Sequence, residues 1–367
     1  MSPDASWVRL REGHVLAVGP SRAGSIECEL DVEGERTRAL AYPGLVGEPL
    51  VGDRVLVNTT ARVLGLGTGG LDLVVAIEGR RPSDPPPEAR GMKARYLPQQ
   101  ASVALVEETH ADAMREARSL AGLPVVAAPL HSLVAPIAAG ARAAGARRIV
   151  YVMTDGAALP LALSRLTDEL RRGGFLDATI TVGQAFGGDH EAVTLWSGLL
   201  AAEAVVGADV AIVADGPGNL GTETTWGVSA LGSGLALNAA SLLGGRAVAC
   251  LRLSFSDGRE RHRGLSHHSR TILGSVCVSE VDVAVPSLPE DQREVVWDAL
   301  RADRLEERHR LVESDGRPGL AALIAAGVAV TSMGRAPDDD PAFFLAGGAA
   351  GVLAGRLAAG RSRWRER

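Results

Sequence analysis

The segment 257–274, DGRERHRGLSHHSRTILG, holds the residues with the most potential for chemistry. Three of the eight histidines lie in it: His262, His267 and His268. Imidazoles transfer protons near neutral pH or bind Zn, Mn or Fe, and arginines suit carboxylate or phosphate ligands. We therefore expect His267 or His268 to move protons, and Arg263 or Arg270 to hold the anionic part of a ligand. A solvated basic loop is the alternative interpretation.

A divalent metal is a second candidate use of these histidines. Adjacent histidines point in different directions on a regular backbone, so His267 and His268 are not expected to bind one metal together. A metal site would combine one of them with His262 or with a distant carboxylate. Asp189 and His190, in GQAFGGDHEAV, are further candidate ligands, although Asp189 equally suits the cap of a predicted helix. Whether the protein uses a cofactor stays open.

Three predicted strands end in Asp-Gly, at Asp155, Asp215 and Asp257. Ligands of open α/β sheets bind beyond the carboxyl ends of the strands, which is where these acids would lie. Asp-Gly is also ordinary turn chemistry, so one occurrence alone indicates little. Three occurrences at comparable positions favour a site. We predict Asp155 and Asp215 as catalytic carboxylates, with Asp215 or Asp189 anchoring a cation or orienting an imidazole.

A glycine-rich loop, GPGNLGTETTWG, follows Asp215 and is a candidate ligand-binding loop. Its expected contributors are backbone N–H groups and one hydroxyl: Gly216, Gly218, Gly221 and Thr222. The loop matches neither a Walker loop nor GxGxxG, and a plain crossover is the alternative.

Lys93 is the only lysine in the chain, beside Arg90 and Arg95. We expect it to contact an anion or, alternatively, to lie on the surface.

The elements that must position these residues fall into two parts. Residues 1–80 read as short alternating strands with turns, which predicts a small β-barrel-like domain. The proline-rich stretch 81–90 predicts a stiff linker. Residues 91–367 alternate between continuous apolar runs and helical stretches. This pattern predicts an α/β domain whose mostly parallel sheet has helices on both faces.

The predicted C-terminal helix, beginning near Pro341, carries glycines at every fourth position: Gly347, Gly351 and Gly355. Such a stripe lets another backbone approach closely. The run is long enough to be a membrane span, but Arg356 interrupts it, and Ala and Gly give weak insertion energy. We therefore expect this helix to pack against protein and not to span a membrane, either within the fold or across a dimer.

Composition excludes several classes of protein. The net charge of −6 makes non-specific nucleic-acid binding unfavourable. With Lys93 as the only lysine and no GK pair, P-loop hydrolysis, pyridoxal chemistry and class I aldolase chemistry are not expected. Cys28, Cys250 and Cys277 are too far apart for a zinc ribbon or a disulfide framework. The charged start lacks a signal-peptide core, so we expect a cytoplasmic protein without a membrane partner.

Several long runs resemble the signature blocks of a bacterial family known only as a domain of unknown function. They are MKARYLPQQ, YVMTDGAALPLALS, DATITVGQAFGGDHEAVT, VADGPGNLGTETTWG and RHRGLSHHS. The resemblance extends over nearly the whole chain. It implies no activity, but the blocks contain seven of the candidate site residues: Asp155, Asp189, His190, Asp215, His262, His267 and His268.

Two functions follow as hypotheses. The first is an enzyme, a hydrolase or transferase, that acts on a small anionic metabolite at the carboxyl ends of the parallel strands. The second is a non-catalytic ligand-binding, scaffold or regulatory protein that forms homo-oligomers through the glycine stripe. The first requires the strand-end aspartates, the glycine loop and the His/Arg segment to meet in one place.

Overall fold

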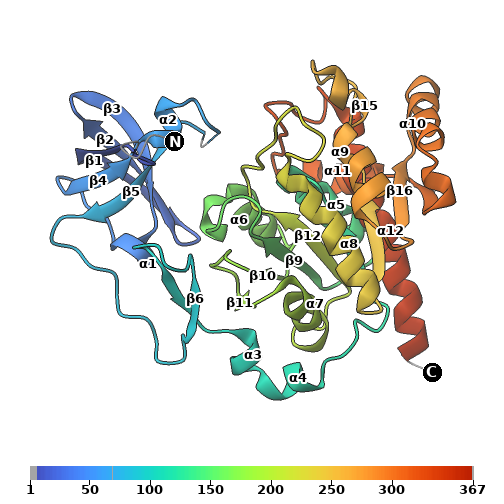
Figure 1. The fold of residues 1–367 in the computed structure, drawn as a ribbon, viewed down its shortest axis with the longest axis horizontal. Coiled ribbons are helices and arrows are strands. Elements are labelled where there is room, and N and C mark those ends of the chain that lie inside the picture. The colour runs from blue at the N-terminus through green and yellow to red at the C-terminus, as the bar shows by residue number, and fades with distance from the viewer. Residues whose placement is uncertain (1–5, 68, 366–367) are drawn as a thin grey trace. The chain divides into compact units, whose positions relative to one another are not determined.

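The computed structural model describes residues 6–67 and 69–365 (Figure 1). The chain divides into two compact units, residues 1–89 with 95–102 and residues 90–94 with 103–367. The predicted linker, residues 81–90, is exposed at nearly every position.

The first unit contains a closed five-stranded barrel. Its strands are β1 (Leu10–Arg22), β2 (Ser25–Val32), β3 (Glu35–Ala41), β4 (Arg54–Asn58) and β5 (Leu71–Ile77), and its short helices are α1 (Pro43–Val46) and α2 (Thr60–Val63). The strand order is β1-β2-β3-β5-β4, with β3 and β5 parallel. Apolar side chains on alternate positions of β2, such as Ile26, Cys28 and Leu30, fill the barrel. The predicted β-barrel-like domain is thus confirmed.

The second unit contains an eight-stranded sheet in which all strands are parallel. The strands are β8 (Pro124–Ala127), β9 (Ile149–Thr154), β10 (Ala178–Thr181), β11 (His190–Glu191), β12 (Val210–Asp215), β13 (Arg246–Cys250), β16 (Asp282–Pro286) and β17 (Arg310–Ser314). Their order is β11-β10-β9-β12-β8-β13-β16-β17. Within this unit β14 (Leu253–Ser254) pairs with β15 (Gly264–Leu265). The short strands β6 (Gly91–Lys93) and β7 (Ala101–Val103) lie where the chain changes from one unit to the other.

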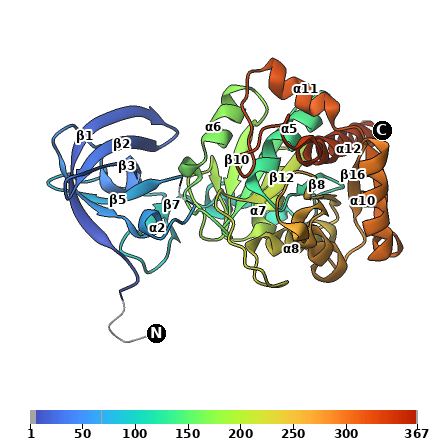
Figure 2. The same cartoon turned by 90° about the horizontal axis from the view of Figure 1, so that it is seen from above.

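Helices cover both faces of this sheet, as the continuous apolar strands predict. The helices are α3 (Val106–Thr109), α4 (Ala111–Glu116), α5 (Val134–Ala143), α6 (Arg165–Arg172), α7 (Leu195–Ala204), α8 (Gly232–Leu242), α9 (His267–Thr271), α10 (Glu290–Ala302), α11 (Arg317–Ala325) and α12 (Pro341–Arg365). Shorter 3₁₀ or π turns are His131–Leu133, Leu161–Leu163, Ser229–Leu231, Glu260–His262, Ile272–Val276 and Leu305–Glu307. One hydrophobic core lies beneath α7, α8 and α10, and the other beneath α5, α6, α11 and α12 (Figures 1 and 2). The α/β prediction is confirmed.

The glycine stripe of α12 is used inside this unit. A side chain at Gly351 would overlap the carbonyl oxygen of Ile137 in α5, and one at Gly355 would overlap Ala144. Residues Pro341–Arg361 are long and apolar enough to cross a membrane, but 78% of the most apolar window is buried in the unit. The helix therefore packs within the fold, and its stripe is not a free surface for a second copy.

The sheet reverses its winding direction among its central strands. The chain continues from β8 and β9 toward the β11 edge, and from β12 and β13 toward the β17 edge. These four strands are neighbours in the order β9-β12-β8-β13. Connections that leave in opposite directions open a crevice at the carboxyl ends of such strands, where ligands of open α/β sheets bind.

Candidate functional site

The His/Arg segment is held against the end of β13 by the hairpin of β14 and β15. Leu253 pairs with Leu265 across the two strands. This pairing brings Arg252, two residues beyond β13, beside the start of α9, where its backbone N–H donates to Ser269 Oγ at 2.8 Å. The segment is therefore folded back onto the sheet, and its histidines His262 and His268 are only 2% and 5% exposed.

Three imidazoles gather at this point. The ring centroid of His262 lies 4.9 Å from that of His267 and 4.8 Å from that of His268. The centroids of His267 and His268 are 4.3 Å apart. One ligand atom from each lies within 4.8 Å of the others. The expectation that only one of the adjacent pair could join His262 was wrong. Successive helical side chains diverge by about 100°, but His262 comes from a separate turn and contacts both rings.

The partners of the rings define their protonation. A guanidinium only donates, so the 2.9 Å contact from Arg252 Nη1 makes His268 Nδ1 an acceptor. In the neutral ring of His268 the hydrogen is therefore on Nε2. His262 Nδ1 lies 2.8 Å from Ser266 Oγ. His267 Nε2 is buried and has no hydrogen-bond partner among the described residues.

These histidines are neutral at physiological pH. Burial, and after it the charge of Arg252, lower the pKa of His262 and of His268 to about 3. Burial and then Arg261 lower the pKa of His267. The unfolded chain binds protons at these positions below about pH 6.5, and the folded chain does not. The cluster therefore makes the fold less stable as the pH falls from about 6.5 toward 3.

A titration followed by NMR checks this protonation state. We expect the Cε1 proton resonances of His262 and His268 to stay constant from about pH 8 to about pH 5, because both rings remain neutral. The imidazole of a histidine in a short peptide shifts over this range and serves as the reference. Midpoints near 6.5 for the two buried rings would contradict the prediction.

Arginines outnumber acids around the cluster. Asp257 pairs with Arg259 at 2.8 Å, with Arg335 at 3.5 Å and with Arg252 at 3.7 Å. The Arg259 guanidinium holds the pKa of Asp257 far below its usual range, so this carboxylate is ionised. Arg335 also pairs with Asp340 at 3.2 Å, so the three arginines meet two carboxylates and one positive charge is left over. An uncompensated charge at a buried position costs free energy. A bound anion would balance it.

The basic pocket next to the cluster has a volume of about 250 Å³. Its lining is Leu130, Asn219, Leu220, Gly221, Thr222, Val228, Ala230, Arg252, Arg259, Arg261, His262, His268 and Met333. Two predicted ligand-binding residues of the glycine loop, Gly221 and Thr222, therefore lie with two predicted histidines. The arginines that line it are not those singled out from the sequence: Arg263 is exposed, and Arg270 binds Asp303.

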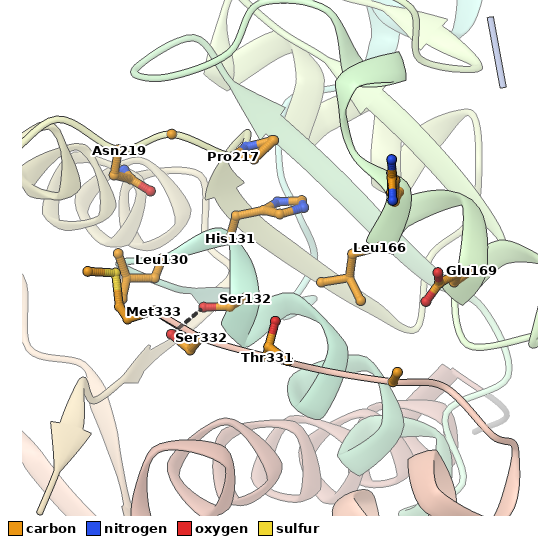
Figure 3. A pocket seen from close by; sticks show the side chains of 13 residues that line it. Leu130, His131, Ser132, Leu166, Glu169, Pro217, Asn219, Thr331, Ser332 and Met333 are labelled. Carbon is orange, nitrogen blue, oxygen red and sulfur yellow. Dashed lines mark hydrogen bonds between the residues drawn. The ribbon is translucent and has the colours of Figure 1, made fainter. Parts of the chain in front are cut away.

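A second pocket, of about 420 Å³, shares walls with the basic pocket (Figure 3). Both are lined by Leu130, Asn219 and Met333. The rest of its lining is His131, Ser132, Arg165, Leu166, Glu169, Pro217, Gly218, Ala329, Thr331 and Ser332. These residues follow β8, β9 and β12 or precede α12, so the second pocket also lies at the carboxyl ends of the central strands. Ser132 and Ser332 are joined by a 3.0 Å hydrogen bond across it.

His131 is a fixed wall of this second pocket. Tyr151 donates to the backbone oxygen of Asp215 at 2.9 Å, which leaves the phenol oxygen to accept from His131 Nδ1 at 3.1 Å. His131 Nε2 lies 2.7 Å from Ser164 Oγ. Burial lowers the pKa of His131 to about 4, so the ring is neutral. Both of its nitrogens are used by the protein, and only its carbon atoms remain for a ligand.

Asp215 lies behind the pockets and acts through Asn219. Its carboxylate accepts from Thr154 Oγ1 at 2.6 Å, from the Gly156 N–H at 3.1 Å and from Asn219 Nδ2 at 2.8 Å. Burial raises the pKa of Asp215. Asp155 is exposed, and its carboxylate accepts from the backbone N–H of Gln184. Neither aspartate lines either of these two pockets, and the hydrogen bonds of both hold the strand-end loops.

The other candidate metal ligands lie elsewhere. Asp189 binds the backbone N–H of Thr179 at 2.8 Å and forms an ion pair with Arg171. His190, in the edge strand β11, lies edge-to-face against His110 with the ring centroids 5.5 Å apart. Four strands separate β11 from β13, so the structure does not bring these two residues to His262. Gly218 lines the second pocket, whereas a side chain at Gly216 would meet Ala158.

Lys93 is buried and contacts the protein itself. Its ammonium donates to the backbone oxygens of Ala192 at 2.9 Å and of Ala185 at 3.0 Å, and lies 3.5 Å from a Glu191 carboxylate oxygen. Its side chain is only 2% exposed. Burial lowers the pKa of Lys93 and raises that of Glu191. The alternative that placed this lysine on the surface was wrong.

Three of the pocket residues that were not singled out from the sequence had a recognisable sequence feature. Arg252 interrupts the apolar run RAVACLRLSF, and a charge inside such a run signals a specific partner. His131 comes directly after the apolar run PVVAAPL, in the strand-end position that drew attention to the aspartates. Asn219 lies inside the glycine loop already selected. Each of these three features could have identified its residue as a candidate for the site.

Comparison with known proteins identifies the family but no activity. A search of the curated proteins finds no match. The family model described as "Protein of unknown function (DUF3866)" matches residues 38–351, which include all the residues of both pockets. The chain therefore belongs to this family.

Proposed function

We propose that this protein is an enzyme, a hydrolase or transferase, that binds a small phosphorylated metabolite in the basic pocket. One observation carries the proposal: Arg252, Arg259 and Arg261 line the same 250 Å³ pocket as the neutral rings of His262 and His268. Arginines hold phosphate oxygens by charge-assisted hydrogen bonds, and neutral imidazoles donate or accept a proton. The pocket lies beside the point where the sheet reverses direction, a common ligand position in open α/β folds.

The hydrogen bonds suggest different roles for the two rings. His268 carries its hydrogen on Nε2, because Arg252 donates to Nδ1, and so would donate to a phosphate oxygen. His262 would accept a proton when its Nδ1–H donates to Ser266 Oγ and leaves Nε2 free. A bound dianion would also offset the arginine charges that lower the pKa of His262, and so make proton acceptance easier.

A divalent metal is the competing occupant, favoured by the short distances between the three imidazoles. The hydrogen bonds argue against it. Histidines that bind metals usually donate their second N–H to an acceptor, whereas His268 accepts at that position from a cation. The nearby arginines also disfavour a cation. Metal analysis of purified protein after supplementation with Zn or Mn distinguishes the two: a stoichiometric metal lost in His267→Ala would replace the anion proposal.

Binding of orthophosphate tests the proposal directly. At about a hundred times Kd it should raise the free energy of unfolding by about 2.7 kcal/mol, seen as a thermal shift. Arg259→Met should weaken binding at least about tenfold, because it removes a phosphate contact. Arg304→Met, on an exposed pair with Glu307 outside both pockets, is the matched control. No shift with orthophosphate or with any phosphate ester would refute the proposal.

Turnover is tested with p-nitrophenyl phosphate, using His262→Ala as the inactive comparison. Ligand binding without turnover of any phosphate ester would favour the non-catalytic alternative.

We place the activity in the cytoplasm, since the three cysteines are free and buried and the long apolar helix belongs to the core.

A further inference from the structure

The second pocket lies where the rest of a phosphorylated ligand would extend. It shares Leu130, Asn219 and Met333 with the basic pocket, so the two pockets adjoin at these residues, which Figure 3 labels in the second pocket. Its 420 Å³ falls in the range of small-molecule sites, which is about 300–1,000 Å³. The two pockets therefore form one bipartite site.

The walls of the second pocket are mainly apolar. Leu166 and Pro217 supply aliphatic surface, together with Leu130 and Met333 of the shared wall. His131 adds ring carbons, because both of its nitrogens are bonded to Tyr151 and Ser164. Surfaces of this kind cover the faces of a flat heterocycle. A sugar would instead present several of its hydroxyls to apolar wall, where they would lose hydrogen bonds to water.

The hydrogen-bonding groups of this pocket, apart from Asn219, are the guanidinium of Arg165, the carboxylate of Glu169 and the hydroxyls of Ser132, Thr331 and Ser332. Ser132 donates to Ser332, whose own hydroxyl hydrogen remains for a ligand. Glu169, on α6, ends in a carboxylate that accepts from ring N–H or amino groups, and Thr331 adds a hydroxyl (Figure 3). Apolar walls with a few placed polar groups select a ring that is apolar on its faces and polar at its rim.

Asn219 presents an acceptor where the two pockets meet. Its Nδ2 donates to Asp215 at 2.8 Å and to Ser229 Oγ at 3.0 Å, so both amide hydrogens are used. The Asp215 carboxylate is hydrogen-bonded as an acceptor, which fixes the orientation of the amide. The Oδ1 atom of Asn219 is left for the ligand, and it suits a hydroxyl donor placed between a phosphate and a ring.

We propose that the bipartite site binds a nucleotide, with its phosphate in the basic pocket, its ribose beside Asn219 and its base in the second pocket. This inference rests on the proposed function, because it needs the basic pocket to hold phosphate. Asp215 is then a positioning residue that acts through Asn219. Its carboxylate does not touch the ligand.

Calorimetric titration separates the two proposals. The probes are orthophosphate, ribose 5-phosphate, the four ribonucleoside monophosphates and their nucleosides. We expect at least one nucleotide to bind at least about tenfold more tightly than orthophosphate, ribose 5-phosphate and its own nucleoside. Ala329→Trp, on an exposed wall position, should abolish this gain and leave orthophosphate binding within about twofold. Ile324→Trp, on the exposed surface of α11 and outside both pockets, is the control.

Each result decides one of the two proposals. If orthophosphate binds and no nucleotide exceeds ribose 5-phosphate, the nucleotide inference fails and the phosphate pocket stands. If a nucleotide binds equally well in Arg259→Met, the base and phosphate are held elsewhere and the bipartite site is refuted. If neither orthophosphate nor any phosphate ester binds, the proposed function itself fails.

Discussion

Gly351→Val is expected to prevent stable folding of the α/β unit. A side chain at this position would overlap the backbone oxygen of Ile137, and neither backbone can move because α5 and α12 are packed along their whole contact. Overpacking of this kind costs about 3 kcal/mol or more, a large part of the stability of a typical domain. The measurement is urea unfolding followed by circular dichroism, or the soluble yield where no folded protein is obtained.

Gly360→Val provides the matched control for this substitution. It makes the same change in the same helix, but nothing lies within 4 Å of the added side chain. We expect it to leave the unfolding midpoint nearly unchanged. Similar losses of stability in both variants would show that valine harms the helix itself and would contradict the packing argument.

Lys93→Met should destabilise the same unit by about 3–5 kcal/mol, the usual cost of removing one partner of a buried charged pair. The substitution keeps the approximate length of the side chain but removes the counter-charge of Glu191 and the donor to the backbone oxygens of Ala185 and Ala192. The Glu191 carboxylate keeps its bonds from Thr181 Oγ1 and the Gly187 N–H. Denaturant unfolding at constant pH measures the loss.

A double substitution identifies the source of that loss. Glu191→Gln removes the carboxylate that would be left uncompensated, so Lys93→Met with Glu191→Gln should lose less stability than the sum of the two single variants. Simple additivity would mean that the pair is not coupled. Unchanged stability of Lys93→Met would show that the ammonium contributes nothing to the fold.

The barrel and the α/β fold could both be predicted because each depends on local sequence patterns. A strand with alternating apolar and polar residues, such as β2, has one buried and one solvent-exposed face. A strand that is apolar at every position, such as β12, must be covered on both faces. The glycine stripe of α12 was also visible, since its spacing is that of one helix face. The sequence did not show which helix packs against the stripe, because glycine spacing is the same whether the partner helix belongs to the same chain or to a second copy.

The candidate site could be predicted only in part. The histidines and the glycine loop were visible by type and position. Arg252 and Lys93 were not correctly placed because their partners lie far along the chain: Lys93 contacts oxygens 92 and 99 residues away. The tight grouping of His262, His267 and His268 depends on the β14–β15 hairpin, whose two-residue strands leave almost no sequence pattern. Long-range packing, and not residue type, decides such contacts.

The path of the chain around Lys93 limits how this protein can be divided. Residues 90–94 belong to the second unit, residues 95–102 to the first, and the chain then returns to the second at 103. A fragment that starts at residue 103 would therefore lack the ammonium bound to Ala185 and Ala192, although it keeps every strand of the parallel sheet. The barrel and the sheet are thus not exchangeable modules joined end to end. Shuffling or truncation at a single junction would remove a structural part of one of them.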